Sequence, residues 1–154
     1  MQSTLDEMDK RILSELQSDA RASVTEIARR VGLSKTPVTL RIKQLEEIGL
    51  ITGYRAMLSP IALGLTHVTF MEVKLSDTRE AALRRFNAAV RMIPEVEECY
   101  MIAGGFDYLI KVRSRDMTDF RRVMAEQISA LPFVASSSSY VSMEAVVDHS
   151  EITI

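Results

Sequence analysis

The chain has 154 residues, of which 47% are apolar and 26% are charged, and its formal net charge is -2. These values are typical of a globular protein with one ordinary domain or two small ones, and they exclude a disordered or collagen-like chain. No apolar run approaches the roughly 18 residues of a membrane span, and residues 1–20 form a charged periodic segment instead of a signal peptide. We therefore expect a cytoplasmic protein.

Two helices are predicted near the N-terminus. Apolar residues recur at helical spacing over residues 5–16, with acidic residues in the first turn, which predicts a helix ending before Ala20. The Ser23 hydroxyl can then cap a second helix, with Glu26 three residues later as in a capping box. Gly32 is expected to end this second helix.

A third helix is expected to start at Ser34 as its cap and to stop at Gly49. Pro37 falls in its first turn, where backbone amides lack intrahelical partners, so this proline is compatible with a helix. Two compact helices joined by a glycine turn match the helix-turn-helix that enters a major groove of DNA. The residues of this third helix expected to contact DNA are Ser34, Lys35, Thr36, Thr39, Leu40, Lys43 and Gln44.

Residues 50–58 are predicted to form a hairpin wing that turns at Thr52 and Gly53 and places Arg55 near a phosphate. Between residues 21 and 55, seven Lys or Arg residues stand against three acidic residues, whereas residues 59–154 carry a net charge of -3. Because the basic charge gathers on the helix-turn-helix, the pattern favours DNA binding. The alternative is a small three-helix bundle whose charged face is only solvated.

The pattern changes after residues 59–65, which contain a proline and a glycine. We therefore interpret residues 1–58 as a DNA-binding domain, residues 59–65 as a linker and residues 66–154 as a second domain. In this second domain, strands are predicted over residues 66–75, 96–103, 106–113 and 134–147, and helices over residues 79–93 and 117–131.

The predicted order of elements, βαββαβ, indicates a ferredoxin-like fold, and residues 73–94 and 112–132 echo each other as two βαβ units. Gly104 and Gly105 are expected to form a tight hairpin turn between the second and third strands. Both helices must cross the same sheet face, yet the first strand has apolar residues on both faces, such as Met71 opposite Phe70. Since no further element can cover the second face, we expect a homodimer.

The sequence offers little for catalysis or metal binding. Cys99 is the single cysteine, lies mid-strand and has no histidine tied to it by a motif, so a structural thiol is favoured over a nucleophile. His67 and His149 provide no zinc-ligand spacing and are expected at the surface or in an interface. We therefore predict no enzyme activity, no metal and no cofactor.

The segment VGLSKTPVTLRIKQLEEIGLITGYRAML, followed by AGGFDYLIKVRSRDM and SYVSMEAV, resembles the Lrp/AsnC (feast/famine) family of transcription regulators. The resemblance covers residues 5–147. It implies an α+β protein with an N-terminal winged helix-turn-helix and a βαββαβ effector and dimerisation domain. It also implies dimers that assemble into tetramers or octamers, with an amino acid or related metabolite bound between effector domains. AGGFDY is most similar to the branch that activates proline or branched-chain amino acid catabolism.

In that family, the turn between strands two and three and the last strand affect the effector response. By matched motif, the corresponding residues are Gly104, Gly105, Asp107, Tyr140, Val141 and Ser142. A Gly-Gly turn leaves backbone amides open to a carboxylate, and a nearby aspartate can accept bonds from an α-amino group. The alternative is a plain hairpin with a local cap. Gly105 stands where the family often has an acidic residue, so the resemblance does not identify the effector.

Two functions follow from these patterns. The first is a sequence-specific DNA-binding regulator whose activity responds to the bound metabolite. The second is a metabolite-binding or assembly module whose helix-turn-helix docks a protein partner. Residues 34–44 favour the first, because a protein-docking helix would expose several apolar residues, whereas only Leu40 does so here.

Overall fold

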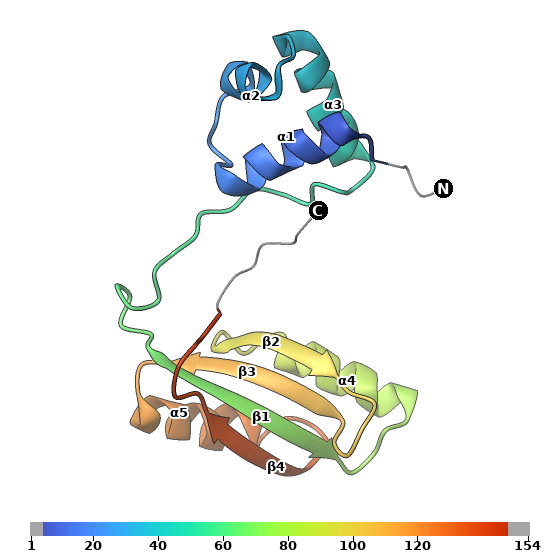
Figure 1. The fold of residues 1–154 in the computed structure, drawn as a ribbon. Helices are drawn as coiled ribbons and strands as arrows, with labels where there is room; N and C mark the ends of the chain where they lie inside the picture. Colours follow the sequence, from blue (N-terminus) through green and yellow to red (C-terminus); the bar gives the residue numbers. More distant parts are fainter. Residues whose placement is uncertain (1–4, 148–154) are drawn as a thin grey trace. The chain divides into compact units, whose positions relative to one another are not determined.

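The computed structural model describes residues 5–147, which divide into two compact units, residues 5–57 and residues 58–147 (Figure 1). Within the described residues, no helix is long and apolar enough to cross a membrane. The first unit is helical, and the second is a four-stranded sheet with helices on one face. The α+β architecture predicted from the sequence is therefore confirmed.

The first unit contains the three predicted helices, α1 (Glu7–Ser18), α2 (Val24–Val31) and α3 (Lys35–Glu47). Their apolar stripes meet in one core, because the side chains at these positions recur at helical spacing. The buried members of this core are Ile12, Ile27, Ala28, Val31 and Val38. This packing fixes α2 and α3 against α1.

The ends of these helices follow local capping chemistry. The Ser23 hydroxyl accepts a hydrogen bond from the backbone amide of Glu26 at 3.2 Å, as predicted. Gly32 and Gly49 both have a φ of 74°, the left-handed conformation that ends a helix at low steric cost. Ser34 occupies the N-cap position of α3, but its side chain makes no capping hydrogen bond.

The hairpin predicted over residues 50–58 is wrong, because the described chain has no strand between α3 and the first strand of the sheet. The segment is instead irregular, and Tyr54 holds it to α3 through a 2.9 Å hydrogen bond to the Glu46 carboxylate. An isolated two-stranded hairpin is marginal in water unless it packs on another element. Here Met57 and Leu58 remain exposed, so these two side chains do not support a hairpin.

The second unit has the predicted βαββαβ order. Its elements are β1 (His67–Leu75), α4 (Glu80–Val90), β2 (Val96–Met101), β3 (Tyr108–Ser114), α5 (Met117–Val123), the π-helix η1 (Met124–Ile128) and β4 (Val134–Val141). The strands form an antiparallel sheet in the order β2-β3-β1-β4. The fourth strand is shorter than the predicted residues 134–147 because its pairing with β1 ends at Val141.

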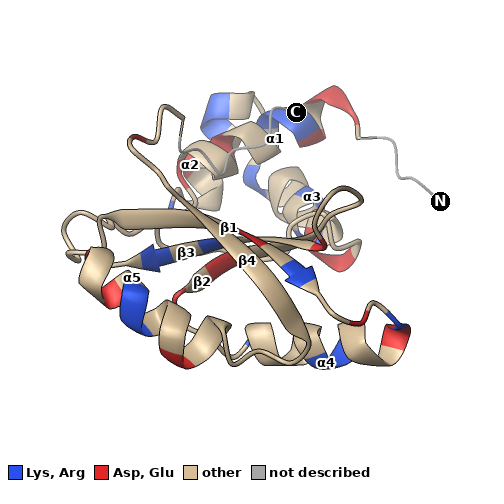
Figure 2. Ribbon diagram, turned by 90° about the horizontal axis from the view of Figure 1, so that it is seen from below, with Lys and Arg blue, Asp and Glu red and all other residues tan. Residues whose placement is uncertain are grey.

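The two faces of this sheet differ. The helices α4 and α5 cover one face (Figures 1 and 2), where Met71 pairs with Ile110 and Val73 pairs with Tyr108, and all four side chains are buried. Within the second unit, the opposite face carries no helix. Phe70 on this open face is 38% exposed and Tyr140 is 53% exposed. The open face is thus a mixed surface of aromatic and charged side chains.

The tight turn predicted at Gly104 and Gly105 is also wrong. The ladder between β2 and β3 continues beyond Met101 and Tyr108, because the Ile102 amide donates to the Asp107 carbonyl oxygen at 2.8 Å. Residues 103–106 are left to form the loop. Neither glycine has a left-handed φ, which a two-residue hairpin turn of the common types requires.

Candidate DNA-binding and effector sites

The helix-turn-helix is formed by α2, the turn at Gly32 and α3. The left-handed Gly32 directs the chain out of α2, and the amide of Leu33 still bonds back to the Ala28 carbonyl at 2.9 Å. The residues expected to contact DNA are all exposed, namely Ser34, Lys35, Thr36, Thr39, Leu40, Lys43, Gln44 and Arg55. The structure brings the first seven together at the start and along one length of α3, whereas Arg55 lies in the irregular segment after it.

The polar side chains on α3 differ in whether they already form ion pairs or hydrogen bonds within the protein. Lys35 forms no ion pair with any described residue and lies at the first position of α3. Lys43 is 3.6 Å from Glu47 one turn later, an exposed pair that holds it weakly. The Thr39 hydroxyl donates to the Lys35 carbonyl at 2.9 Å, so it offers a ligand its lone pairs and its methyl group. Lys35 is the most available cation of the helix.

Two of the seven basic residues counted between residues 21 and 55 form ion pairs within the helical unit. Arg30 bonds to Glu15 at 2.9 Å and to Glu26 at 2.7 Å. Arg41 bonds at 2.6 Å to Asp6, the N-cap residue of α1, and at 2.7 Å to Asp9 within α1. Hydrogen bonds that the two guanidinium groups donate to these carboxylates raise the pKa of both arginines. The charge counted from the sequence therefore overstates the charge that is free to meet a phosphate.

Arg29 is a candidate that the sequence reasoning passed over. It lies in the last turn of α2, is exposed and forms no ion pair within residues 5–147. The charge count included it, but the expected DNA contacts were drawn from α3 and the wing alone. Its position three residues before Gly32 was the available signal, since the end of α2 borders the turn that leads into α3.

At the effector loop, Asp107 has a defined structural role. Its amide donates to the Val73 carbonyl at 3.0 Å, and its Oδ2 accepts from the Leu75 amide at 2.7 Å. Asp107 therefore caps the end of β1 with one carboxylate oxygen. This role is close to the alternative of a plain hairpin with a local cap. Gly104 and Gly105 lie in the adjoining loop, and nothing stands within 4 Å of the side-chain position of Gly105.

The other expected effector residues lie at the opposite end of β1. Tyr140 pairs with Phe70, Val141 pairs with Thr69, and the Ser142 amide donates to the Val68 carbonyl at 2.9 Å. The six steps along β1 from Thr69 to Leu75 correspond to roughly 20 Å. One chain therefore does not bring the two groups of residues together.

Cys99, His67 and His149 are the residues that the sequence analysis considered for catalysis or metal binding. Burial raises the pKa of the Cys99 thiol, which opposes a reactive thiolate. The His67 ring lies 3.1 Å from the Thr69 hydroxyl, and His149 lies outside the described residues. Among residues 5–147, no group of three or more His, Cys, Asp or Glu side chains is arranged to hold a metal ion.

Comparisons with known proteins match both units. Residues 5–52 match a winged helix-turn-helix DNA-binding family, and residues 68–152 match the Lrp/AsnC ligand binding domain. The chain is 68% identical over 148 residues to a proline dehydrogenase transcriptional activator of Rhodobacter capsulatus, covering 96% of each chain. It is 41% identical over 150 residues to a leucine-responsive regulatory protein of Salmonella typhimurium, covering 97% of this chain and 92% of the relative.

A comparison with solved structures also matches a transcriptional regulator. A transcriptional regulator from Neisseria meningitidis, in complex with L-Met, superposes with a TM-score of 0.91 at 31% sequence identity, covering 97% of each chain. The matched domains, their order and the relatives all correspond to the resemblance found in the sequence. The chain therefore belongs to the Lrp/AsnC family of DNA-binding transcriptional regulators.

Proposed function

We propose that this regulator acts as a homodimer or larger assembly, controls a gene of proline degradation and responds to an amino acid. The helix α3 reads the DNA with the exposed residues from Ser34 to Gln44, and Lys35 and Arg55 contact phosphates. The observation that carries the DNA contact is the unpaired, exposed Lys35 at the start of α3, three residues after the left-handed Gly32. The target gene rests on the 68% identity to the Rhodobacter capsulatus activator.

The open face of the sheet supports the homodimer. It exposes Phe70 and Tyr140 beside charged groups that are already paired, since Lys111 lies 3.2 Å from Glu98 and 3.4 Å from Glu97. Figure 2 shows the basic segments of β3 beside the acidic segments of β2 on this sheet. A second copy can bury the aromatic rings without leaving these charges unpaired, which makes the face suitable for a symmetric contact.

The separation of the expected effector residues supports a site shared between subunits. The loop with Gly104 and Gly105 lies about 20 Å from Tyr140 and Ser142 along β1. A small amino acid cannot span that distance within one chain. In the proposed site the loop of one subunit meets the last strand of another, so effector binding changes how the subunits assemble.

DNA binding can be tested by fluorescence anisotropy on the promoter of a proline-degradation gene at several salt concentrations. Lys35→Ala is expected to weaken binding and to reduce the slope of log affinity against log salt by about 1. Arg84→Ala is the matched control, because Arg84 is an exposed arginine paired with Glu80 in the second unit. An unchanged slope in Lys35→Ala would remove this residue from the interface.

The same assay, repeated with each of the twenty amino acids, tests the effector. We expect at least one amino acid to shift the affinity of the parent protein for DNA, and Ser142→Ala to reduce that shift without changing binding in the absence of effector. If none of the twenty changes DNA binding or the oligomer distribution, the proposed effector class is wrong.

A further inference from the structure

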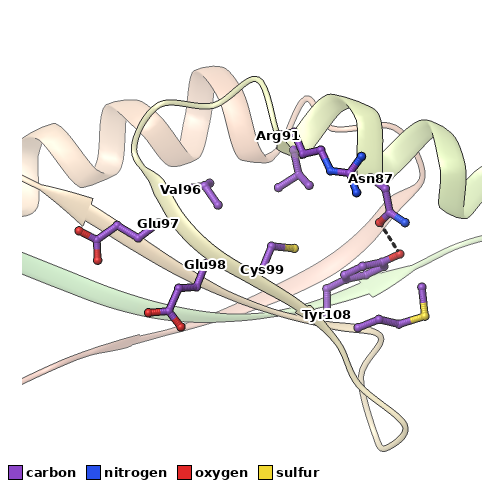
Figure 3. Close-up of a pocket in the computed structure, with 9 residues that line it drawn as sticks. Asn87, Arg91, Val96, Glu97, Glu98, Cys99 and Tyr108 are labelled. Carbon is purple, nitrogen blue, oxygen red and sulfur yellow. Dashed lines mark hydrogen bonds between the residues drawn. The ribbon is translucent and has the colours of Figure 1, made fainter. Parts of the chain in front are cut away.

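A groove of about 420 Å³ lies between the second half of α4 and the strand β2 (Figure 3). Its walls include Asn87 and Arg91 of α4, Val96, Cys99 and Met101 of β2, and Tyr108 of β3. None of these residues belongs to the proposed DNA or effector contacts, although Tyr108 follows Asp107 directly. The volume is within the range of small-molecule sites.

Two hydrogen-bond donors meet at one end of this groove. The Tyr108 hydroxyl donates to the Asn87 Oδ1 at 2.8 Å, which fixes the amide and leaves its NH₂ group as a free donor. Arg91 is exposed and forms no ion pair with any residue that the structure describes. Figure 3 shows the Arg91 and Asn87 side chains next to each other. A guanidinium beside an amide NH₂ is a suitable pair of donors for a carboxylate.

The acidic residues of the groove do not compete for Arg91. Glu98 lies 3.2 Å from Lys111, and Glu97 pairs with both Lys111 and Arg113. Figure 3 shows Glu97 and Glu98 at the other end of the groove, with both side chains pointing away from Arg91. The donor end therefore keeps an uncompensated positive charge.

Between these two ends lie the side chains of Val96 and Cys99. Val96 and Cys99 are partly buried and pack against the core of the second unit. Because burial raises the pKa of the Cys99 thiol, this side chain is a neutral wall at physiological pH and adds no negative charge. A ligand with one anionic end and a short apolar body matches this arrangement.

We propose that the groove binds a small monocarboxylate with a short aliphatic chain, its carboxylate held by Arg91 and Asn87 and its apolar body against Val96, Cys99 and Met101. The carboxylate is the group that is recognised, so acids with and without an α-amino group both qualify. This site is separate from the effector site proposed between subunits.

Cys99 makes the test direct, because it is the single cysteine of the chain and it lines the groove. The rate of its alkylation by iodoacetamide is measured in the full-length protein with isovalerate, 2-oxoisovalerate, L-valine or the uncharged isovaleramide. A carboxylate present at ten times its half-saturating concentration is expected to slow alkylation about tenfold. Isovaleramide, and sodium chloride at equal ionic strength, are expected to give no protection.

Three variants decide the cause of any protection. Arg91→Gln is expected to abolish it, while Arg84→Gln, an exposed arginine of the same helix paired with Glu80, is expected to retain it. Ser142→Ala, at the far end of the sheet, is also expected to retain it, which separates this groove from the effector site. Equal protection in Arg91→Gln, protection lost in Ser142→Ala, or no protection by any of the three acids would overturn the proposal.

Discussion

At the scale of single residues, Gly32 determines the turn of the helix-turn-helix. Its φ of 74° lies in the left-handed region, yet no atom stands within 4 Å of a Cβ added there. The cost of an alanine is therefore conformational and not a clash. We expect Gly32→Ala to lower the free energy of unfolding by about 1 kcal/mol. Urea unfolding and amide hydrogen exchange in α2 and α3 of the full-length protein measure this change.

Gly105→Ala is the matched control for this prediction. Gly105 also has free space around its side-chain position, but its φ is not left-handed. Alanine is expected to leave stability unchanged or to raise it slightly, since it restricts the unfolded chain. If the two substitutions had the same effect, the left-handed turn would not be the reason that residue 32 is a glycine.

Single residues also show where sequence-based prediction succeeds and where it fails. Ser23, Gly32 and Gly49 act through neighbours three to five residues away, so their capping roles were visible in the sequence. Phe133 adopts a φ of 66°, which an aromatic residue rarely does, while its ring receives the Arg85 guanidinium at 5.2 Å. Its carbonyl accepts from Ser76, 57 residues earlier. No local pattern contains such a long-range restraint.

At the scale of elements, the existence and order of helices and strands were predictable, whereas their ends and joints were not. The apolar period that predicted one helix over residues 117–131 does not distinguish α5 from the π-helix η1 that continues it. The conformation of the loop that contains Gly104 likewise depends on residues outside the loop, because Asp107 bonds to two residues of β1. Tertiary contacts, which a periodic pattern does not record, decide both features.

The carboxylates of Asp6 and Asp9 fasten α1 to α3 through Arg41, and this contact depends on pH. The backbone amide of Asp9, and next the Arg41 guanidinium, lower the pKa of Asp6 below its usual 3.8. Folding thus favours the ionised carboxylate. Its stabilising contribution is fully present above pH 3.8 and is lost as the pH falls through the lowered value.

We therefore expect hydrogen exchange in α1 and α3 to accelerate as the pH falls below this value, after correction for the intrinsic exchange rate. Asp6→Asn should show faster corrected exchange already at neutral pH and a smaller change on acidification. Asp77→Asn provides the control, because Arg79 lowers the pKa of Asp77 to about 2 in the second unit. That substitution should leave the α1 and α3 amides unchanged, and an equal effect of both variants would contradict a local role for Asp6.

At the scale of the whole molecule, the proposed homodimer would present two copies of α3 to one DNA site. One copy offers few free cations, because Arg30 and Arg41 are held by carboxylates of the same unit. A dimer that places two such helices on one site gains affinity from effective concentration, without any new contact to DNA. In the proposed dimer, the open face of the sheet would contribute to DNA binding although it carries none of the proposed DNA contacts.

Phe70→Glu tests this dependence. Phe70 lies at the centre of the open face, paired with Lys111 on one side and Tyr140 on the other. A glutamate there would be buried without a free partner in the dimer, so the variant is expected to elute as a monomer in size exclusion with light scattering. Its affinity for the promoter of a proline-degradation gene should fall by roughly 100-fold.

Met92→Glu is the control for Phe70→Glu, because Met92 is 80% exposed and lies beyond the end of α4, outside the sheet. It introduces the same charge at another exposed apolar residue and should leave both the assembly and the DNA affinity unchanged. Circular dichroism must show that the Phe70→Glu monomer keeps its fold. A folded Phe70→Glu protein that still dimerises would mean that the subunits pair through a different surface. A monomeric variant that binds the promoter at parental affinity would show that α3 reads DNA without pairing.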